Sequence, residues 1–167
     1  MYRYKIVLMI IPEKLIKQCD TLFLDRDGVV NVWLPGDYVK TWDEFCFNEG
    51  FTDFISRYSD SFRHIIIVTN QRGVGKGLMT LEQLEEIHSR MLESIAGAGG
   101  RIDHIYICTS LMDSDPMRKP NPGMAFQAMS DYPDISMDRS LMIGDQPSDR
   151  LFALNCGMHF LFWDNKS

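Results

Sequence analysis

The chain has 167 residues, 45% hydrophobic and 24% charged, which is enough to bury one core without disulfides or a structural metal. Its formal net charge of -6 opposes non-specific attraction to nucleic-acid phosphates, so we expect a small partner and no nucleic acid. The longest apolar run, IVLMII at 6–11, is too short for a membrane span, and the four cysteines include no C-x-x-C pair, as expected in a reducing cytoplasm.

Short apolar runs alternate with helical patterns along the chain. Each run is nearly continuous, which is typical of strands buried on both faces of a parallel sheet. In the clearest helical pattern, apolar residues recur at helical spacing, and Thr80 with Gln83 resembles a capping box. The predicted strands are Thr21–Leu24, Ile65–Val68, Ile102–Ile107, Leu141–Ile143 and His159–Phe162, and the predicted helices are Leu81–Ile95, Pro122–Met129 and Ser148–Asn155.

This alternation predicts a doubly wound, Rossmann-like α/β fold, with a central, mostly parallel sheet and helices on both faces. We expect residues 1–167 to form a single domain whose ligand lies at the carboxyl ends of the strands. The segment 29–47 is too short for a second folded domain, and we expect it to be a flap beside the site. The sequence indicates no role for residues 1–19 and no oligomeric state.

An aspartate pair follows the first predicted strand, in the sequence LFLDRDGVVN. Asp25 and Asp27 are two positions apart, so an extended backbone would point both carboxylates to one side. Two like charges this close need a cation between them or a proton on one of them. A solvated acidic turn would also explain the tetrapeptide DRDG taken alone.

A second acidic pair occurs in the sequence LMIGDQPSDR. Asp145 stands at a predicted strand end, and Asp149 follows one helical turn later if a helix starts near Pro147. Asp145 alone could be a helix N-cap. Oxygen ligands from separate strand ends, with no histidine or cysteine among them, favour Mg²⁺ over zinc.

The two other strand ends carry groups suited to an anion. Thr69 closes the strand HIIIVTN, while Arg118 and Lys119 precede a predicted helix whose N-terminus favours negative charge. The glycine-rich stretch 69–80, TNQRGVGKGLMT, is not a P-loop, because its first required glycine is missing and Lys76 is followed by glycine instead of a hydroxyl residue. We therefore expect Thr69 to contact a phosphate and the glycines to turn the chain away.

Together, these segments resemble the motifs of the haloacid dehalogenase superfamily of phosphohydrolases: D-x-D-G, a strand-end Ser/Thr, a Lys, and G-D-x-x-x-D. Through FLDRDGVVN, VTNQ.G...G, RKPNPGM and IGD...D, the chain further resembles the branch of heptose bisphosphate phosphatases and histidinol-phosphatase domains, over about residues 21–162. The resemblance implies that superfamily's fold with a minimal cap domain or none. The matched positions are Asp25, Asp27, Thr69, Lys119, Asp145 and Asp149.

The resemblance also implies a role for each matched position. Asp25 would attack phosphorus and form an aspartyl-phosphate, and Asp27 would act first as general acid and then as general base. Mg²⁺ would be held by Asp25, the backbone carbonyl of Asp27 and Asp145. The phosphoryl group would be stabilised by Thr69 and Lys119, with Asp149 orienting Lys119 or a metal-bound water.

The expected substrate is a small phosphorylated metabolite, in the first place a sugar phosphate such as D-glycero-D-manno-heptose 1,7-bisphosphate. Arg118, Lys119 and Lys76 would offer enough positive charge for a second phosphate. The alternatives are a histidinol-phosphate phosphatase, a nucleic-acid 3′-phosphatase and a non-catalytic phosphoprotein-binding module. The candidate substrate-binding residues are Asn31, Asn70, Gln71, Lys76 and Arg118.

One departure from the branch concerns zinc. Many of its members carry a C-x-H pair and a C-x-C pair before the arginine of the RKP segment. This chain keeps only Cys108 of those ligands, and a structural zinc site needs all of its positions filled. We therefore expect no zinc and a shortened loop.

Overall fold

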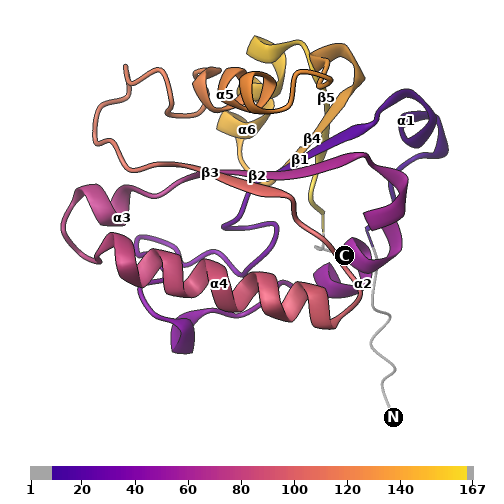
Figure 1. The fold of residues 1–167 in the computed structure, drawn as a ribbon. Coiled ribbons are helices and arrows are strands. Elements are labelled where there is room, and N and C mark those ends of the chain that lie inside the picture. The colour runs from indigo at the N-terminus through magenta and orange to yellow at the C-terminus, as the bar shows by residue number, and fades with distance from the viewer. Residues whose placement is uncertain (1–8, 165–167) are drawn as a thin grey trace.

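A computed structural model describes residues 9–164, so part of the apolar run at 6–11 lies outside the described range. One five-stranded sheet forms the centre, in the order β3-β2-β1-β4-β5, and every neighbouring pair is parallel (Figure 1). The predicted doubly wound α/β fold is confirmed. The strands are β1 Thr21–Leu24, β2 His64–Asn70, β3 His104–Cys108, β4 Ser140–Gly144 and β5 His159–Phe162.

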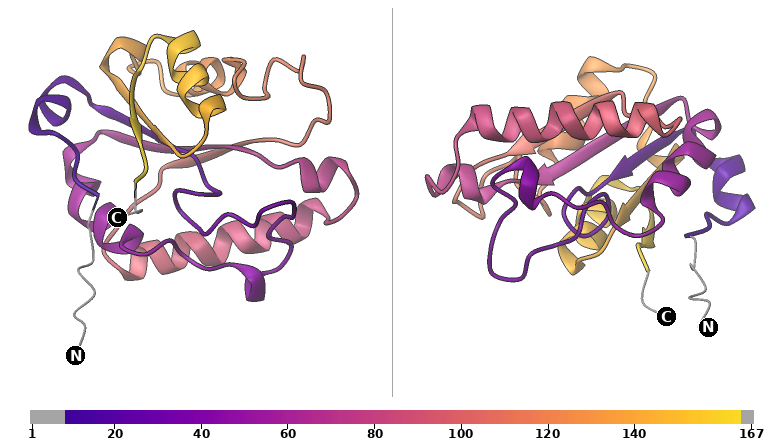
Figure 2. Two further views of the ribbon diagram at one scale, coloured as in Figure 1. Left: turned by 180° about the vertical axis from the view of Figure 1, so that it is seen from behind. Right: turned by 90° about the horizontal axis from the view of Figure 1, so that it is seen from below.

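Helices cover both faces of this sheet. In Figure 1, α5 and α6 lie above the sheet, while α2 and α4 lie below it. The view from below shows α4 running across the lower face, with the segment that follows β1 beside it (Figure 2). The helices are α1 Glu13–Gln18, α2 Phe51–Tyr58, α3 Arg72–Gly75, α4 Leu81–Gly97, α5 Gly123–Asp131 and α6 Pro147–Cys156, with short 3₁₀ helices η1 Trp42–Glu44, η2 Ser59–Ser61 and η3 Met137–Arg139.

The strands are apolar throughout because successive side chains enter different cores. Leu22 and Leu24 pack with α2 and α4 on one face, whereas Phe23 packs with α5 and α6 on the other. All three side chains are fully buried. A strand covered on both faces needs apolar residues at consecutive positions, which is the pattern that predicted it.

Most predicted elements differ from the observed ones only at their ends. β2 runs on to Asn70, and β3 begins at His104, two residues later than predicted. The predicted capping box of α4 is present: Gln83 N donates to Thr80 Oγ1 at 3.1 Å, and Thr80 N donates to Gln83 Oε1 at 2.8 Å. This box sets where α4 starts.

Three helices, α1, α2 and α3, were not predicted. In α2, apolar residues recur at the helical spacing i, i+3, i+4 and i+7, and all four are buried. The signal for α2 was therefore in the sequence, within an eight-residue stretch FTDFISRY. No helix within residues 9–164 is long and apolar enough to cross a lipid bilayer.

The order of the strands fixes where a ligand can bind. The chain runs from β1 outward through β2 to β3, and then returns to place β4 on the other side of β1. The direction of winding therefore reverses between β1 and β4. In open α/β sheets, the crevice outside the carboxyl ends at such a switch point receives the ligand.

Candidate active site

The aspartates that follow β1 and β4 meet at this switch point. Leu24 and Ile143 are paired in register, and Asp25 N donates to Ile143 O at 3.0 Å. Gly28 lets the chain leave β1 sharply, with a φ of 97°, and a Cβ at this position would lie 2.1 Å from Asp145 Oδ2. The glycine of the DRDG sequence thus makes room for Asp145.

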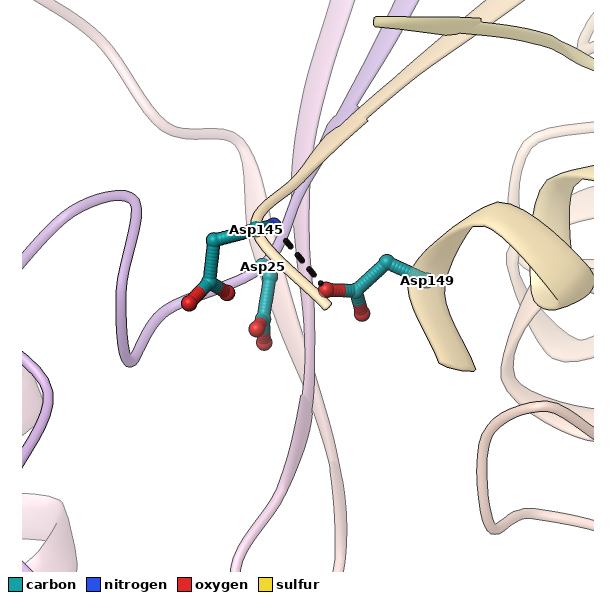
Figure 3. Close-up of side chains that lie close together, drawn as sticks. All are labelled: Asp25, Asp145 and Asp149. Carbon is teal, nitrogen blue, oxygen red and sulfur yellow. Dashed lines mark hydrogen bonds between the residues drawn. The ribbon is translucent and has the colours of Figure 1, made fainter. Parts of the chain in front are cut away.

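Three carboxylates converge here, as Figure 3 shows for Asp25, Asp145 and Asp149. Each offers an oxygen within 4.8 Å of the other two. As predicted, α6 begins at Pro147 and brings Asp149 to the site in its first turn. Asp149 Oδ2 accepts from Asp145 N at 3.2 Å, and the N-cap of α6 is Gln146, so the alternative of Asp145 as N-cap is wrong.

The cluster has free oxygens suited to a hard cation. Asp145 Oδ1 is buried and accepts no hydrogen bond from the residues that the structure describes. The two hydrogen bonds that Asp25 accepts both go to Oδ1, from Arg26 N and Lys119 Nζ, which leaves Oδ2. Burial raises the pKa of both carboxyl groups above their ordinary values, so a bound cation would favour their ionised forms. The residues present therefore fit Mg²⁺.

Lys119 joins the two sides of the cluster. Its buried ammonium donates to Asp25 Oδ1 at 2.8 Å and to Asp149 Oδ1 at 2.7 Å. Burial alone would lower the pKa of Lys119, but the negative charges of Asp25 and Asp149 raise it above its ordinary value. Lys119 therefore stays protonated and supplies a fixed positive charge.

Asp27 is held by hydrogen bonds to both of its oxygens. Oδ1 accepts from Arg26 Nη2 at 2.8 Å and from Asn31 Nδ2 at 2.9 Å, and Oδ2 accepts from Gln71 Nε2 at 2.8 Å. Burial alone would raise the pKa of Asp27, but the Arg26 charge and these hydrogen bonds lower it below its ordinary value. The contacts of Asn31 and Gln71 are thus with Asp27, and their predicted role in binding substrate stays a prediction.

Two polar residues at the end of β2 complete the arrangement. Thr69 is buried, and its Oγ1 accepts from Gln71 Nε2 at 2.9 Å, so the threonine hydroxyl keeps its own proton to donate. The Asn70 side chain makes two hydrogen bonds to the backbone of Lys119. Asn70 Nδ2 donates to Lys119 O, and Lys119 N donates to Asn70 Oδ1, both at 3.0 Å. Asn70 therefore fixes the loop that carries Lys119.

A cavity of about 250 Å³ opens beside these groups. Arg118 lines it, and its buried Nη1 has no hydrogen-bond partner among the described residues, while Nε donates to Asp113 Oδ1 at 3.2 Å. Lys76 is not among the residues that line it, and its ammonium lies 5.3 Å from the centroid of the Tyr38 ring. The lining residues are Asp25, Asp27, Asn70, Arg118, Lys119, Gln146, Ser148 and Asp149 and, from the segment 29–47, Trp33, Leu34, Asp37, Tyr38 and Val39.

Sequence reasoning missed two residues next to the site. Arg26 was quoted within DRDG without a role, although its side chain is fully buried against Asp27. His88 falls within the helix predicted at Leu81–Ile95 and was given no role, and its Nε2 lies 3.2 Å from Arg26 Nη1. A histidine in an otherwise apolar helical face was the available signal.

An aspartate pair at a strand end, a lysine bridging two carboxylates and a parallel sheet with this topology are typical of phosphohydrolases of the haloacid dehalogenase class. Residues 37–165 match the family model described as polynucleotide kinase 3 phosphatase. The chain belongs to the haloacid dehalogenase superfamily of phosphatases, in the branch of the heptose-1,7-bisphosphate 7-phosphatases, as its named relatives show.

Three of these relatives illustrate the match. The D-glycero-alpha-D-manno-heptose-1,7-bisphosphate 7-phosphatase of Mycobacterium tuberculosis is 36% identical, over 80% of this chain and 71% of the relative. The D-glycero-beta-D-manno-heptose-1,7-bisphosphate 7-phosphatase of Helicobacter pylori is 34% identical, over 80% and 76%. The crystal structure of D,D-heptose 1,7-bisphosphate phosphatase from B. bronchiseptica, complexed with magnesium and phosphate, has a TM-score of 0.79 at 32% identity, over 84% and 78%.

Proposed function

We propose that this chain hydrolyses a phosphate monoester of a small sugar phosphate, with D-glycero-D-manno-heptose 1,7-bisphosphate as the leading substrate and Mg²⁺ as cofactor. The observation that carries this proposal is the convergence of Asp25, Asp145 and Asp149 beside a cavity, with Asp25 and Asp149 both paired to the buried Lys119 ammonium. The names of the relatives support the substrate, and the magnesium and phosphate of the B. bronchiseptica structure support the cofactor.

The first half of the reaction transfers the phosphoryl group to Asp25. A carboxylate oxygen of Asp25 attacks phosphorus, the bond to the leaving oxygen breaks, and that oxygen takes a proton from Asp27. Lys119 and the Thr69 hydroxyl stabilise charge on the transferring group. Asp25, the backbone carbonyl of Asp27 and Asp145 would hold Mg²⁺, which would supply positive charge to offset the repulsion between the Asp25 carboxylate and the phosphate.

The second half releases phosphate. Water attacks the phosphorus of the aspartyl-phosphate, Asp27 takes the proton of that water, and the carboxylate of Asp25 is regenerated. The hydrogen bonds from Asn31 and Gln71 stabilise the ionised form of Asp27, which is the form that accepts this proton. Asp149 keeps Lys119 in place throughout.

The position of Arg118 supports the proposal that the substrate carries a second anionic group. Arg118 lines the cavity, and its buried Nη1 has no hydrogen-bond partner among residues 9–164. A buried guanidinium donor without a partner is costly unless a ligand satisfies it. The segment 29–47 gives the opposite side of the cavity an apolar and aromatic surface, through Trp33, Leu34 and Tyr38. We propose that this segment acts as a flap over the substrate.

A nucleic-acid 3′-phosphatase is the second candidate, because the matching family model carries that description. The net charge of -6 counts against it, since binding to phosphate backbones is driven by clustered positive charge. The same charge and the size of the cavity favour a small metabolite. The absence of zinc and the cytoplasmic location stay predictions.

The test is a phosphatase screen with Mg²⁺ over heptose 1,7-bisphosphate, its monophosphates, histidinol phosphate and a 3′-phosphorylated oligonucleotide. We expect kcat/KM for the bisphosphate to exceed the others by at least about tenfold, or ~1.4 kcal/mol. A preference for the oligonucleotide would establish the second candidate. No hydrolysis of any of them would refute a phosphatase function and favour a non-catalytic binding module.

A further inference from the structure

A buried arginine lies directly behind Asp27. The side chain of Arg26 is fully buried, and its Nη2 donates to Asp27 Oδ1 at 2.8 Å. Its Nε has no hydrogen-bond partner among residues 9–164. A guanidinium is always charged and carries only donors, so each buried N–H without an acceptor is costly. The hydrogen bond made by the other terminal nitrogen, Nη1, is therefore needed to offset the cost of burying the guanidinium.

That contact is with His88 on α4. Its Nε2 lies 3.2 Å from Arg26 Nη1, across 62 positions of sequence. Because Arg26 can only donate, Nε2 of His88 must be the acceptor, and the ring proton must sit on Nδ1. Burial and the Arg26 charge lower the pKa of His88 from 6.5 to about 3, which keeps the ring in this neutral form.

The surroundings of His88 show that packing alone does not call for a histidine. Its neighbours on the same face of α4 include Leu84, Ile87 and Met91, all buried and apolar. A leucine or methionine at position 88 would complete that apolar face, but it would leave Arg26 Nη1 without a hydrogen-bond acceptor. The ring of His88 thus fixes where the guanidinium lies.

The orientation of Arg26 bears on the chemistry of Asp27. Asn31 and Gln71 hold the Asp27 carboxylate as neutral donors, whereas Arg26 alone brings a full positive charge to it. Asp27 must give up a proton in one half of the proposed reaction and take one in the other. Movement of the guanidinium by even a fraction of an ångström changes how readily both transfers occur.

We propose that His88 is a positioning residue for acid–base catalysis: by accepting from Arg26 Nη1, it fixes the Arg26 guanidinium against Asp27. This inference rests on the proposed phosphatase function. It requires an acceptor at the place of Nε2, and not merely a side chain that fills the space.

Two variants separate these requirements. His88→Gln keeps an acceptor at about the position of Nε2, and His88→Leu removes it while filling the site. Each is compared on heptose 1,7-bisphosphate, whose alkoxide leaving group needs a proton, and on p-nitrophenyl phosphate, whose leaving group does not. The quantity measured is kcat/KM, which reports the steps through transfer to Asp25.

We expect His88→Leu to lose at least about tenfold in kcat/KM on the sugar phosphate and less than about threefold on p-nitrophenyl phosphate, within the range of general acid catalysis. His88→Gln should stay within about threefold of the wild type on both. Ile87→Ala, on the same face of α4, serves as a matched control for lost packing and should leave the ratio of the two substrates unchanged.

Equal losses of the His88→Leu variant on both substrates would show a purely structural role and overturn the inference, as would wild-type activity. An independent readout is the ¹⁵N NMR spectrum of the His88 ring in the wild type, where we expect an unprotonated Nε2. A protonated Nε2 would overturn the inference even if His88→Leu does not fold. If the wild type hydrolyses neither substrate, the proposed function itself fails, and this inference with it.

Discussion

The ammonium of Lys119 lies 2.8 Å from Asp25 Oδ1, although the two residues are 94 positions apart in the chain. This contact brings the RKP segment onto the end of β1 and places a permanent positive charge beside the proposed nucleophile. The same ammonium separates Asp25 from Asp149, which would otherwise repel each other in a buried site. Lys119 thus stabilises the fold and, in the proposed reaction, would also serve the chemistry.

Replacing Lys119 with methionine should therefore lower both activity and stability. We expect kcat to fall by about 10²–10³-fold, the size of effect seen when one charge-stabilising donor is removed. Loss of a buried partner should also cost about 3 kcal/mol of unfolding free energy, because two buried carboxylates lose their cation. Phosphate-release assays and urea unfolding check the two effects. A variant with unchanged kcat would contradict the assigned role.

Asp145 should control Mg²⁺ binding. Its buried Oδ1 accepts no hydrogen bond from any described residue, so we expect Asp145→Asn to weaken the ion strongly. In a thermal-unfolding assay, Mg²⁺ at ~100 times its Kd should stabilise the wild type by about 2.7 kcal/mol and the variant by much less. Asp60→Asn, a change in the exposed part of η2, is the control and should keep the full Mg²⁺ shift. Equal shifts in all three proteins would exclude Asp145 as a ligand.

His88 should make stability depend on pH. Its pKa is lowered from 6.5 to about 3 in the fold, so between these pH values the unfolded chain binds a proton that the folded chain does not. Stability must then fall as pH falls, by up to about 1.4 kcal/mol per unit below pH 6.5. Urea unfolding at pH 7 and pH 5 should show this loss in the wild type and a smaller one in His88→Gln. An equal loss in both proteins would mean that His88 titrates normally.

Arg118 should matter most for a substrate with two phosphates. Arg118 lines the cavity, and its Nη1 has no partner in the part of the chain that the structure describes. We therefore expect Arg118→Met to raise KM for heptose 1,7-bisphosphate by at least about tenfold, or ~1.4 kcal/mol. KM for p-nitrophenyl phosphate, which has no second phosphate, should change far less. Arg90→Met, on the exposed side of α4, is the matched control. Parallel increases for both substrates would place Arg118 at the reacting phosphate instead.

The groups at the strand ends were predictable because parallel strands end at one edge of a sheet. Asp25 and Asp145 follow β1 and β4, and Thr69 lies at the end of β2, so their proximity follows from the strand pattern alone. Lys119 needed more than this pattern, because its loop is fixed by Asn70. The position of Lys119 in the site was predicted from the resemblance of the RKP segment to the superfamily's motif.

The contacts of Asn31 and Gln71 could not be predicted from the same pattern. Both residues were expected near the site, but their donation to Asp27 depends on the turn after Gly28 and on the backbone beyond β2. The pairing of His88 with Arg26 depends on how α4 packs against the sheet, which no local pattern encodes. Side-chain partners between distant elements are thus the part that required the structure.

The central claim is that Asp25 is the nucleophile, and phosphate release by Asp25→Asn tests it most directly. The variant keeps the shape of the side chain but cannot attack phosphorus as a carboxylate. With Mg²⁺ and the best substrate of the screen, we expect phosphate release at background level from a protein that still unfolds cooperatively. Turnover close to that of the wild type would contradict the claim.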